Sequence, residues 1–458
     1  MVPHSRRGCK RASRIPQPGL CCNRAPGGPI LKARLGERPM AASFSTVTRR
    51  HNAILALYNP GYRWLWFASF FTWSALQMQG LARGYLARDL TEDPFTITAV
   101  FAMGSAPIIF APFAGALADR VDRKLLVAAA ETLNLGVTLI TAILVTTGGI
   151  SVPALMVLGF ISGFLMGVTL PARQAMIADL VAPEAAPNGL VLFNGVFNVT
   201  MIAGPAIAGF IVSGGGVEAA YYTALAVNVV GLLLVLRVPR LPPSRKVSGQ
   251  SAMQTFVDGF RYIGKTPFLA QLLIGAGLVT MFSAPYQSLL PIFQRDVLKV
   301  DASGLGWLQT ATGIGGLIAA AALAVSASRS RNTGWMLFFG VLSGLCVAGF
   351  ARSELFLLSV FLMFLVGFFQ SLYMIINMTL VQVVTTKEFQ GRVFSIRIVI
   401  WGVAPLGQLA VGGLANAYSP QTALAIFGLS AAATQVGMIF RLRGAREPEG
   451  GAATRPGG

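Results

Sequence analysis

Cysteine, histidine and charged side chains are all scarce in this chain of 458 residues. It contains four cysteines and two histidines, and charged residues make up only 12% of it. Three of the cysteines and both histidines precede residue 52, so Cys346 is the single thiol in the remainder. A disulfide framework, a paired-thiol or histidine metal site and a nucleophile–histidine pair are therefore excluded from the main part of the chain. We expect no metal and no cofactor.

Long hydrophilic stretches are also missing. The longest one between apolar segments, residues 238–266, is too short for a nucleotide-binding domain, and the sequence contains no Walker loop. An ATP-driven pump is therefore excluded for this chain on its own, and nothing in the sequence indicates an enzyme.

Apolar sequence is abundant and makes up 54% of the chain. A helix needs about 20 apolar residues to cross a bilayer. Twelve stretches qualify: roughly 64–87, 96–117, 125–147, 152–172, 188–213, 218–237, 267–293, 303–327, 334–351, 355–384, 391–417 and 420–440. Backbone groups inside a bilayer have no water to bond, so these stretches must be helices, and the alternating pattern of a membrane barrel is absent. The sequence predicts an all-α membrane protein with twelve transmembrane helices in two six-helix pseudo-symmetric halves.

Basic residues are distributed unevenly between the connections. Fourteen Lys or Arg fall in the even-numbered connections, Arg173 among them, and four in the odd-numbered ones. Short basic loops stay on the cytoplasmic side of a membrane. We therefore expect a multi-pass protein of the cell (inner) membrane with both termini in the cytoplasm.

The first 50 residues are strongly basic, with eleven Lys or Arg and one acid, Glu37. They lack the apolar core of a signal peptide, and their composition is typical of disorder. This segment is interpreted as a cytoplasmic tail, as an upstream extension of a chain that begins at Met40, or as an organellar transit peptide. A nucleic-acid role is the weakest interpretation, because nothing folded presents the basic run, and we expect no nucleic-acid partner.

A duplication organises the rest of the chain. We predict a basic tail (1–57), a six-helix half (58–237), a cytoplasmic linker (238–266), a second six-helix half (267–440) and a C-terminal tail (441–458). The fifth and eleventh spans are interrupted by glycine and proline at matching places: Gly204, Pro205 and Gly209 in one, Pro405 and Gly407 in the other. Paired interruptions of this kind indicate transporter repeats, although glycines that only allow close packing give the same pattern.

A short charged loop joins the second and third spans. It reads Gly115-Ala-Leu-Ala-Asp119-Arg120-Val-Asp-Arg123-Lys124. This pattern resembles the signature of the major facilitator superfamily of secondary transporters between its second and third helices. In that family the acid approaches the start of the eleventh helix, here about Phe389 to Arg392, which includes Gly391. The resemblance implies that these residues form a cytoplasmic gate in which Asp119 stabilises the outward-facing state.

Other segments resemble one branch of that superfamily, which contains enterobactin exporters and macrolide-efflux proteins, with lysophospholipid transporters nearby. They are 171–181, 285–297, 304–306 and 391–395, and the likeness covers about residues 58–440. It implies a twelve-helix bundle that works by alternating access, with a central cavity lined by the first, fourth, seventh and tenth helices. The Gly204–Gly209 segment is similar to the antiporter motif of the fifth helix, which favours export.

The sequence departs from this branch at three places. The first span has Gln77 and Gln79 where many exporters have an acid, Met201 stands where relatives often have Arg, and the second copy of the loop motif (328–331) lacks Asp. Proton coupling is therefore left open. The one enclosed acid is Glu131, a candidate for the coupling site, because burial raises the proton affinity of a carboxyl group. It could instead reach the interface or pair with Arg123.

Candidate cavity residues follow from helix identity and facing: Trp73, Gln77 and Arg83 in the first span, Tyr286 and Gln287 in the seventh, and Gln370, Tyr373 and Asn377 in the tenth. Aromatic and amide groups suit an amphipathic organic molecule. Arg83 is costly in lipid, so we expect it either to attract an anionic substrate or to reach outward to the interface.

We therefore expect a monomeric secondary active transporter that exports a small amphipathic organic molecule, siderophore-like or drug-like, across the bilayer. Whether protons are the counter-substrate is left open. The alternatives are a lysophospholipid flippase and a transport-inactive sensor or assembly protein with the same fold.

Overall fold

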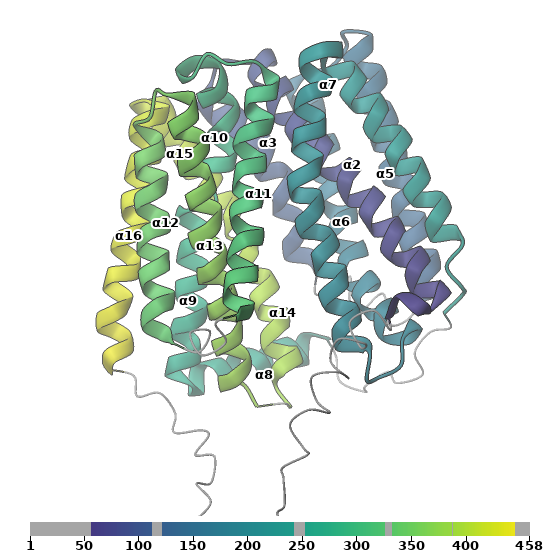
Figure 1. Ribbon diagram of the computed structural model, residues 1–458, viewed down its shortest axis with the longest axis vertical. Helices are drawn as coiled ribbons and strands as arrows, with labels where there is room; N and C mark the ends of the chain where they lie inside the picture. The colour runs from purple at the N-terminus through teal and green to yellow at the C-terminus, as the bar shows by residue number, and fades with distance from the viewer. Residues whose placement is uncertain (1–55, 112–120, 242–251, 326–331, 387, 445–458) are drawn as a thin grey trace, which may run out of the picture. The chain divides into compact units, whose positions relative to one another are not determined.

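The computed structural model describes residues 56–111, 121–241, 252–325, 332–386 and 388–444 (Figure 1). The described residues form helices and connecting turns, with no strand among them. The helices are α2 (Pro60–Leu90), α3 (Pro94–Ser105), η1 (Ala106–Phe110), α5 (Arg123–Thr146), α6 (Val152–Leu180), α7 (Ala186–Leu236), α8 (Ala252–Lys265), α9 (Pro267–Phe282), α10 (Tyr286–Ile292), η2 (Phe293–Val297), α11 (Ala302–Val325), α12 (Thr333–Ala351), α13 (Phe356–Val384), α14 (Gln390–Trp401), α15 (Ala404–Ala417) and α16 (Pro420–Gly444). The predicted all-α membrane fold is confirmed.

Local sequence sets where several helices begin. Asn59 and Asp93 cap α2 and α3, and each precedes a proline at the first helical position. Asp122 caps α5 by accepting from the backbone N–H of Lys124 at 2.9 Å. Such side chains satisfy backbone donors that the first turn leaves unpaired, and a proline there removes a donor that would have no partner.

Nine helices in the described part of the chain are long and apolar enough to cross a membrane, and Pro94–Phe110 is a shorter apolar helix. One of the nine, α7, consists of two helices joined at Gly216, whose φ of 79° is readily adopted only by glycine. Each of the twelve predicted ranges is mostly helical where the structure describes it. The count of twelve stays a prediction.

Two breaks divide other predicted spans. The seventh is α9 followed by α10 and η2, and the eleventh is α14 followed by α15, with turns at Gly402 and Val403 between the last two. The predicted linker 238–266 is not entirely irregular, because it contains α8. This short helix packs on α14, where Tyr262 stacks on Phe389 with ring centroids 4.3 Å apart. In Figure 1, α8 lies at the lower end of the bundle and α10 at the upper end; we call these the α8 end and the α10 end.

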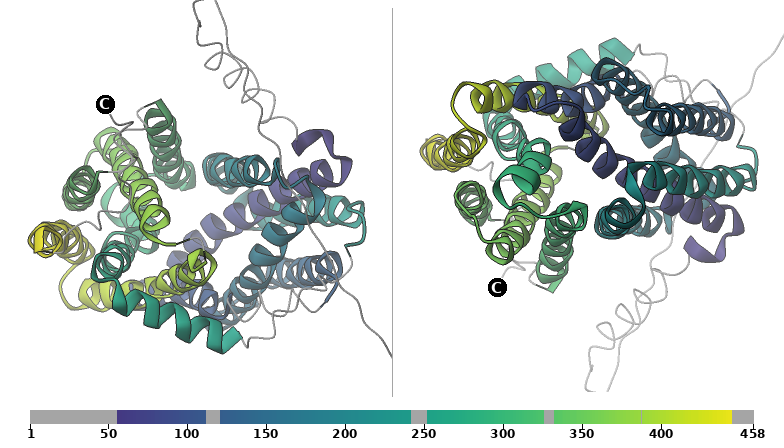
Figure 2. Two further views of the ribbon diagram at one scale, coloured as in Figure 1. Left: turned by 90° about the horizontal axis from the view of Figure 1, so that it is seen from below. Right: turned by 90° about the horizontal axis from the view of Figure 1, so that it is seen from above.

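We call residues 60–236 the N-terminal set and residues 267–444 the C-terminal set. The two sets pack through α7 against α11 and through α3 against α15. Gly209 and Gly306 permit the first contact, because a Cβ on Gly209 would lie 3.0 Å from the Cα of Gly306. The views along the bundle show the two sets side by side (Figure 2). The domain boundaries derived from the sequence stay predictions.

Candidate functional site

A buried ion pair lies inside the N-terminal set. Arg173 on α6 donates from Nη2 to Oε1 of Glu131 on α5 at 2.6 Å, and the two side chains are 1% and 3% exposed. The fourth predicted span ends at residue 172, which leaves Arg173 in the connection that follows it. The structure corrects this, because α6 continues to Leu180 and buries Arg173. The pairing explains how an arginine is tolerated there, since a buried charge without a partner costs several kcal/mol.

The first helix completes the surroundings of Arg173. Its Nη1 donates to Oγ of Ser69 at 2.6 Å, and its Nη2 lies 3.3 Å from Oγ1 of Thr72. Three helices, α2, α5 and α6, therefore meet at one guanidinium group. A displacement of any of them changes the environment of Glu131.

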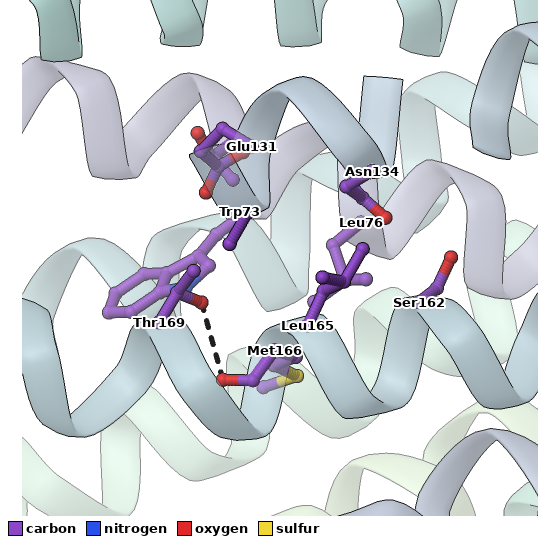
Figure 3. A pocket seen from close by; sticks show the side chains of 10 residues that line it. Trp73, Leu76, Glu131, Asn134, Ser162, Leu165, Met166 and Thr169 are labelled. Atoms are coloured by element: carbon purple, nitrogen blue, oxygen red, sulfur yellow. Dashed lines mark hydrogen bonds between the residues drawn. The ribbon is translucent and has the colours of Figure 1, made fainter. Parts of the chain in front are cut away.

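A small cavity adjoins Glu131 (Figure 3). Its volume is about 20 Å³, which admits a water molecule, since one water needs roughly 10–15 Å³ on this measure. Glu131 Oε2, Asn134 Oδ1 and Ser162 Oγ are buried and form no hydrogen bond within the protein. Five of its ten lining residues are polar, so the cavity suits water, and its volume is too small for an organic substrate.

The predicted residues of the first helix occupy different environments. Trp73 lines this cavity and packs edge-on against Phe193 and Phe197, with ring centroids at 4.6 and 5.1 Å. Gln77 lies against Gly204 of α7, where it fills the space that a side chain on that glycine would need. Arg83 does not reach outward. Its guanidinium group lies against Gly159 and beside Tyr221, within the N-terminal set.

In the C-terminal set, Tyr373 and Asn377 are fully buried. Asn377 donates from Nδ2 to the carbonyl oxygen of Leu272 at 2.9 Å, and its Oδ1 accepts from Nη1 of Arg397 at 3.1 Å. Two further predicted cavity residues are connected to each other: Gln287 Nε2 lies 3.4 Å from the hydroxyl of the buried Tyr286. Gln370, the last one, is half-buried.

Charged residues connect the two sets at the α10 end. Arg88 donates from Nε and Nη2 to the two carboxylate oxygens of Asp296, at 3.1 and 2.7 Å. Arg295 donates to Oδ1 of Asp89 at 2.9 Å. The two pairs are reciprocal, because α2 and η2 each contribute one arginine and one aspartate, so they hold the first helix against the end of the seventh.

The predicted gate lies partly outside the described residues, which do not include Gly115, Asp119 and Arg120. Arg123 forms an ion pair with Asp179 and not with Glu131. Lys124 donates to the carbonyl oxygen of Leu236 at 2.7 Å. Arg392 pairs with Asp258 of α8 at 3.5 Å, and Gly391 is exposed. Of the helix-kink residues, Gly204, Pro205, Gly209, Pro405 and Gly407 are all buried at helix contacts.

Arg397 was not among the residues predicted from the sequence. It is an arginine within the predicted span 391–417, and an ionisable residue inside a span is a recognised signal of function. Gln435 and Asn228, which are fully buried and whose side-chain amides form no hydrogen bond, were not predicted either. An isolated amide in an apolar helix gives only a weak sequence signal, because whether it is paired depends on other helices.

The sequence is similar to those of known membrane transport proteins. A family model described as transmembrane secretion effector matches residues 52–452. The enterobactin exporter of Shigella boydii is 26% identical over 375 residues, which cover 81% of this chain and 88% of that protein. The enterobactin exporter of Escherichia coli O81 is 25% identical over the same shares.

Solved structures resemble the fold. The nucleoside transporter NupG superposes with a TM-score of 0.65 at 16% identity, over 84% of this chain and 98% of that chain. A bacterial homologue of the human lysosomal transporter Spinster, in an inward-facing and unoccupied conformation, gives a TM-score of 0.64 at 15% identity, over 85% and 99%. The chain belongs to the transmembrane secretion effector family of the major facilitator superfamily, and it is a multi-pass membrane transport protein rather than an enzyme.

Proposed function

We propose that this protein exports a small amphipathic organic molecule across the inner membrane by alternating access, as a monomer with both termini in the cytoplasm. Support for export comes from its relatives, which are exporters of enterobactin, a siderophore. Support for the orientation comes from the basic connections, which favour the cytoplasmic side.

The proposal of alternating access is supported by the positions of the contacts between the two helix sets. Besides the reciprocal ion pairs at the α10 end, two side-chain hydrogen bonds join the sets within the part of the chain that the structure describes. They run from Ser105 to Gln408, at 2.9 Å, and from Thr310 to the carbonyl oxygen of Ile202, at 3.1 Å. Ser105 and Thr310 lie 11 and 8 residues from the starts of α3 and α11, or about 17 and 12 Å along them.

The ion pairs and the Thr310 hydrogen bond lie toward the α10 end, whereas Ser105 lies near the middle of the bundle. The charged contacts therefore support a state that is closed at the α10 end. With the basic side in the cytoplasm, that state faces inward. Transport then requires the ion pairs at the α10 end to separate, and they can do so because partly exposed pairs contribute only about 1 kcal/mol or less.

For energy coupling we propose proton antiport through Glu131. Its Oε2 has no hydrogen bond and adjoins the cavity that admits water, while its Oε1 holds Arg173. Protonation would remove the charge that pairs with Arg173 and would loosen the contact of α5 and α6 with α2. A proton bound on one side of the membrane could in this way favour one conformation.

Metabolite profiling of cells that lack this protein tests the proposed export. We expect an amphipathic organic compound to accumulate inside the cells and to disappear from the medium, and the purified protein in vesicles should then move that compound. Retention of no compound would contradict export. A change confined to lysophospholipids would support the flippase alternative instead.

The coupling is tested with Glu131→Gln in the same vesicles. The variant keeps a hydrogen-bond acceptor for Arg173 but cannot ionise. Uphill transport driven by a pH gradient should be lost, whereas exchange of labelled for unlabelled substrate should continue. Asp179→Asn is the matched control, because Asp179 also pairs with an arginine but is 34% exposed. Gradient-driven transport that persists in Glu131→Gln would refute the assignment.

A further inference from the structure

The C-terminal set contains a buried arginine that has no carboxylate partner among the described residues. Arg397 on α14 is 7% exposed, and its one hydrogen bond is donated to the neutral carboxamide of Asn377. It lies seven residues into α14, or about 10 Å along the helix from Gln390. A cation in this position is costly in a membrane span and therefore indicates a function.

The elements packed around Arg397 offer no negative charge. Neither α9 nor α13 contains Asp or Glu, and the same holds for α16 and η1. The one acid of α8, Asp258, pairs with Arg392. Among the described residues, these elements therefore provide no counter-ion for Arg397.

The free edge of the guanidinium group has a specific geometry. Nη1 donates a hydrogen bond to Asn377, while Nε and Nη2 form no hydrogen bond with the described residues. Neither of these two nitrogens is fully buried, so both are accessible to a small molecule. These two nitrogens form the edge that binds a carboxylate through two parallel bonds. Arg88 uses the same two nitrogens to hold both oxygens of Asp296.

Other polar groups near Arg397 are also unpaired. Tyr373 is close enough for Arg397 to act on it electrostatically. Its hydroxyl group and the amide of the neighbouring Gln435 are buried and form no hydrogen bond. Around this polar cluster the helices are apolar, with Leu272 and Ile396 in the same hydrophobic core.

We propose that Arg397, held in place by Asn377, binds the carboxylate group of the transported molecule. This inference rests on the proposed transport function and deepens it by naming the substrate class: an organic acid with an apolar body. An organic acid suits the site better than an inorganic anion, because its apolar part can pack on the surrounding helices, which adds free energy that a bare ion cannot gain.

Binding at this site also acts on a movable element. Because α14 is separated from α15 by the turn at Gly402 and Val403, a carboxylate that bridges Arg397 to the α13 side of the site would tie this half-helix to α13. The substrate would then favour one arrangement of α14, which is what a transported molecule must do to drive a conformational change.

The experiment measures equilibrium binding to the full-length protein in lipid nanodiscs. The ligands are 1-naphthoate and its neutral counterpart 1-naphthamide, followed by their fluorescence. Wild type should prefer the carboxylate by about tenfold to a hundredfold, as a charged hydrogen bond contributes. Arg397→Gln should remove this preference, and Arg397→Lys should retain part of it, because lysine keeps the charge without the fork.

Arg352→Gln is the control, since Arg352 is exposed at the end of α12 in the same set, and it should bind like wild type. Equal binding of the two ligands to wild type, no binding of either, or an unchanged preference in Arg397→Gln would overturn the proposal. Displacement of 1-naphthoate by millimolar chloride would assign the site to an inorganic ion and would also overturn the proposal.

The binding site and the transport function can fail separately. A protein that binds 1-naphthoate through Arg397 but moves no compound in vesicles would support the binding site and contradict the transport function.

Discussion

The two helix sets each bury an arginine but surround it with different partners. In the N-terminal set Arg173 has a carboxylate, Glu131, and two hydroxyl groups around it. In the C-terminal set Arg397 has one carboxamide, that of Asn377. In the first arrangement the arginine's charge is paired within the protein, although Arg173 Nε forms no hydrogen bond. The second arrangement leaves a pair of donors for another molecule.

The two sites also correspond by position. Helices α6 and α13 both have 29 residues, and Arg173 and Asn377 are each the twenty-second. The same place in the predicted repeat thus carries a cation in one set and, in the other, the amide that contacts a cation from the next helix. A duplicated fold can in this way assign proton binding to one set and anion binding to the other.

Among the variants considered, removing the carboxylate of Glu131 should have the largest effect on stability. Glu131→Ala leaves Arg173 buried and uncompensated, which costs about 3–5 kcal/mol. We expect a large fall in the midpoint of thermal unfolding and little monodisperse protein after purification. Stability close to wild type would mean that water or lipid can replace Glu131, and the contrast between the two arginines would then lose its meaning.

The double variant Glu131→Leu with Arg173→Met is the control. Replacing both members of a buried pair by apolar residues of similar size is often neutral or stabilising. The double variant should therefore be clearly more stable than Glu131→Ala, although without pH-driven transport. A double variant as unstable as Glu131→Ala would indicate that the loss arises from packing.

Removing the arginine of the C-terminal set should instead increase the stability of the protein. Arg397→Met eliminates a buried cation at the loss of one hydrogen bond to Asn377, so we expect a gain of about 1–2 kcal/mol. The midpoint of thermal unfolding in nanodiscs should rise by a few degrees while 1-naphthoate binding is lost. A marked loss of stability would show that Arg397 has a structural role.

The sequence predicted the helical membrane fold because apolar length and charge placement are local properties of the chain. It also pointed to Glu131, as the one enclosed acid. The partner of Glu131 could not be predicted from the sequence, because Arg173 directly follows a predicted span and is buried only by the packing of α2, α5 and α6. Counted by sequence position alone, Arg173 is indistinguishable from a basic loop residue.

Arg397 could have been found in the sequence, since it stands inside an apolar span. Its lack of a carboxylate partner could not, because that depends on which helices surround α14. Pro405 indicated the break at Gly402 in advance. Helix α8 was not predicted, because it lies in a linker whose first part is rich in proline, serine and basic residues. What escapes the sequence is therefore the set of contacts between helices distant along the chain.

A third arginine lies between these extremes. Arg88 has a carboxylate partner in the opposite set, and the side chains of Arg88 and Asp296 are 11% and 40% exposed. Arg88→Gln should cost the closed α10 end about 1 kcal/mol, which shifts the populations of the two states roughly fivefold. Ala302 is 2% exposed and packs on Gly209. A cysteine introduced by Ala302→Cys should accordingly react faster with a thiol reagent in the Arg88→Gln background, as read by peptide mass spectrometry. An unchanged rate would show that this pair does not hold the end closed.

The reciprocal pair should have the smallest effect. The side chains of Arg295 and Asp89 are 48% and 56% exposed, so water screens their charges and either partner is solvated when the other is removed. Asp89→Asn should change the labelling rate at Ala302→Cys less than Arg88→Gln does, because exposed pairs contribute about 0.2–1 kcal/mol. The residual effect should vanish at about 1 M salt, where the Debye length is about 3 Å, while that of Arg88→Gln should persist in part. If the two variants were equivalent and equally sensitive to salt, burial would not determine how strongly a charge pair holds the sets together. The inference drawn from the more deeply buried Arg173 and Arg397 would weaken accordingly.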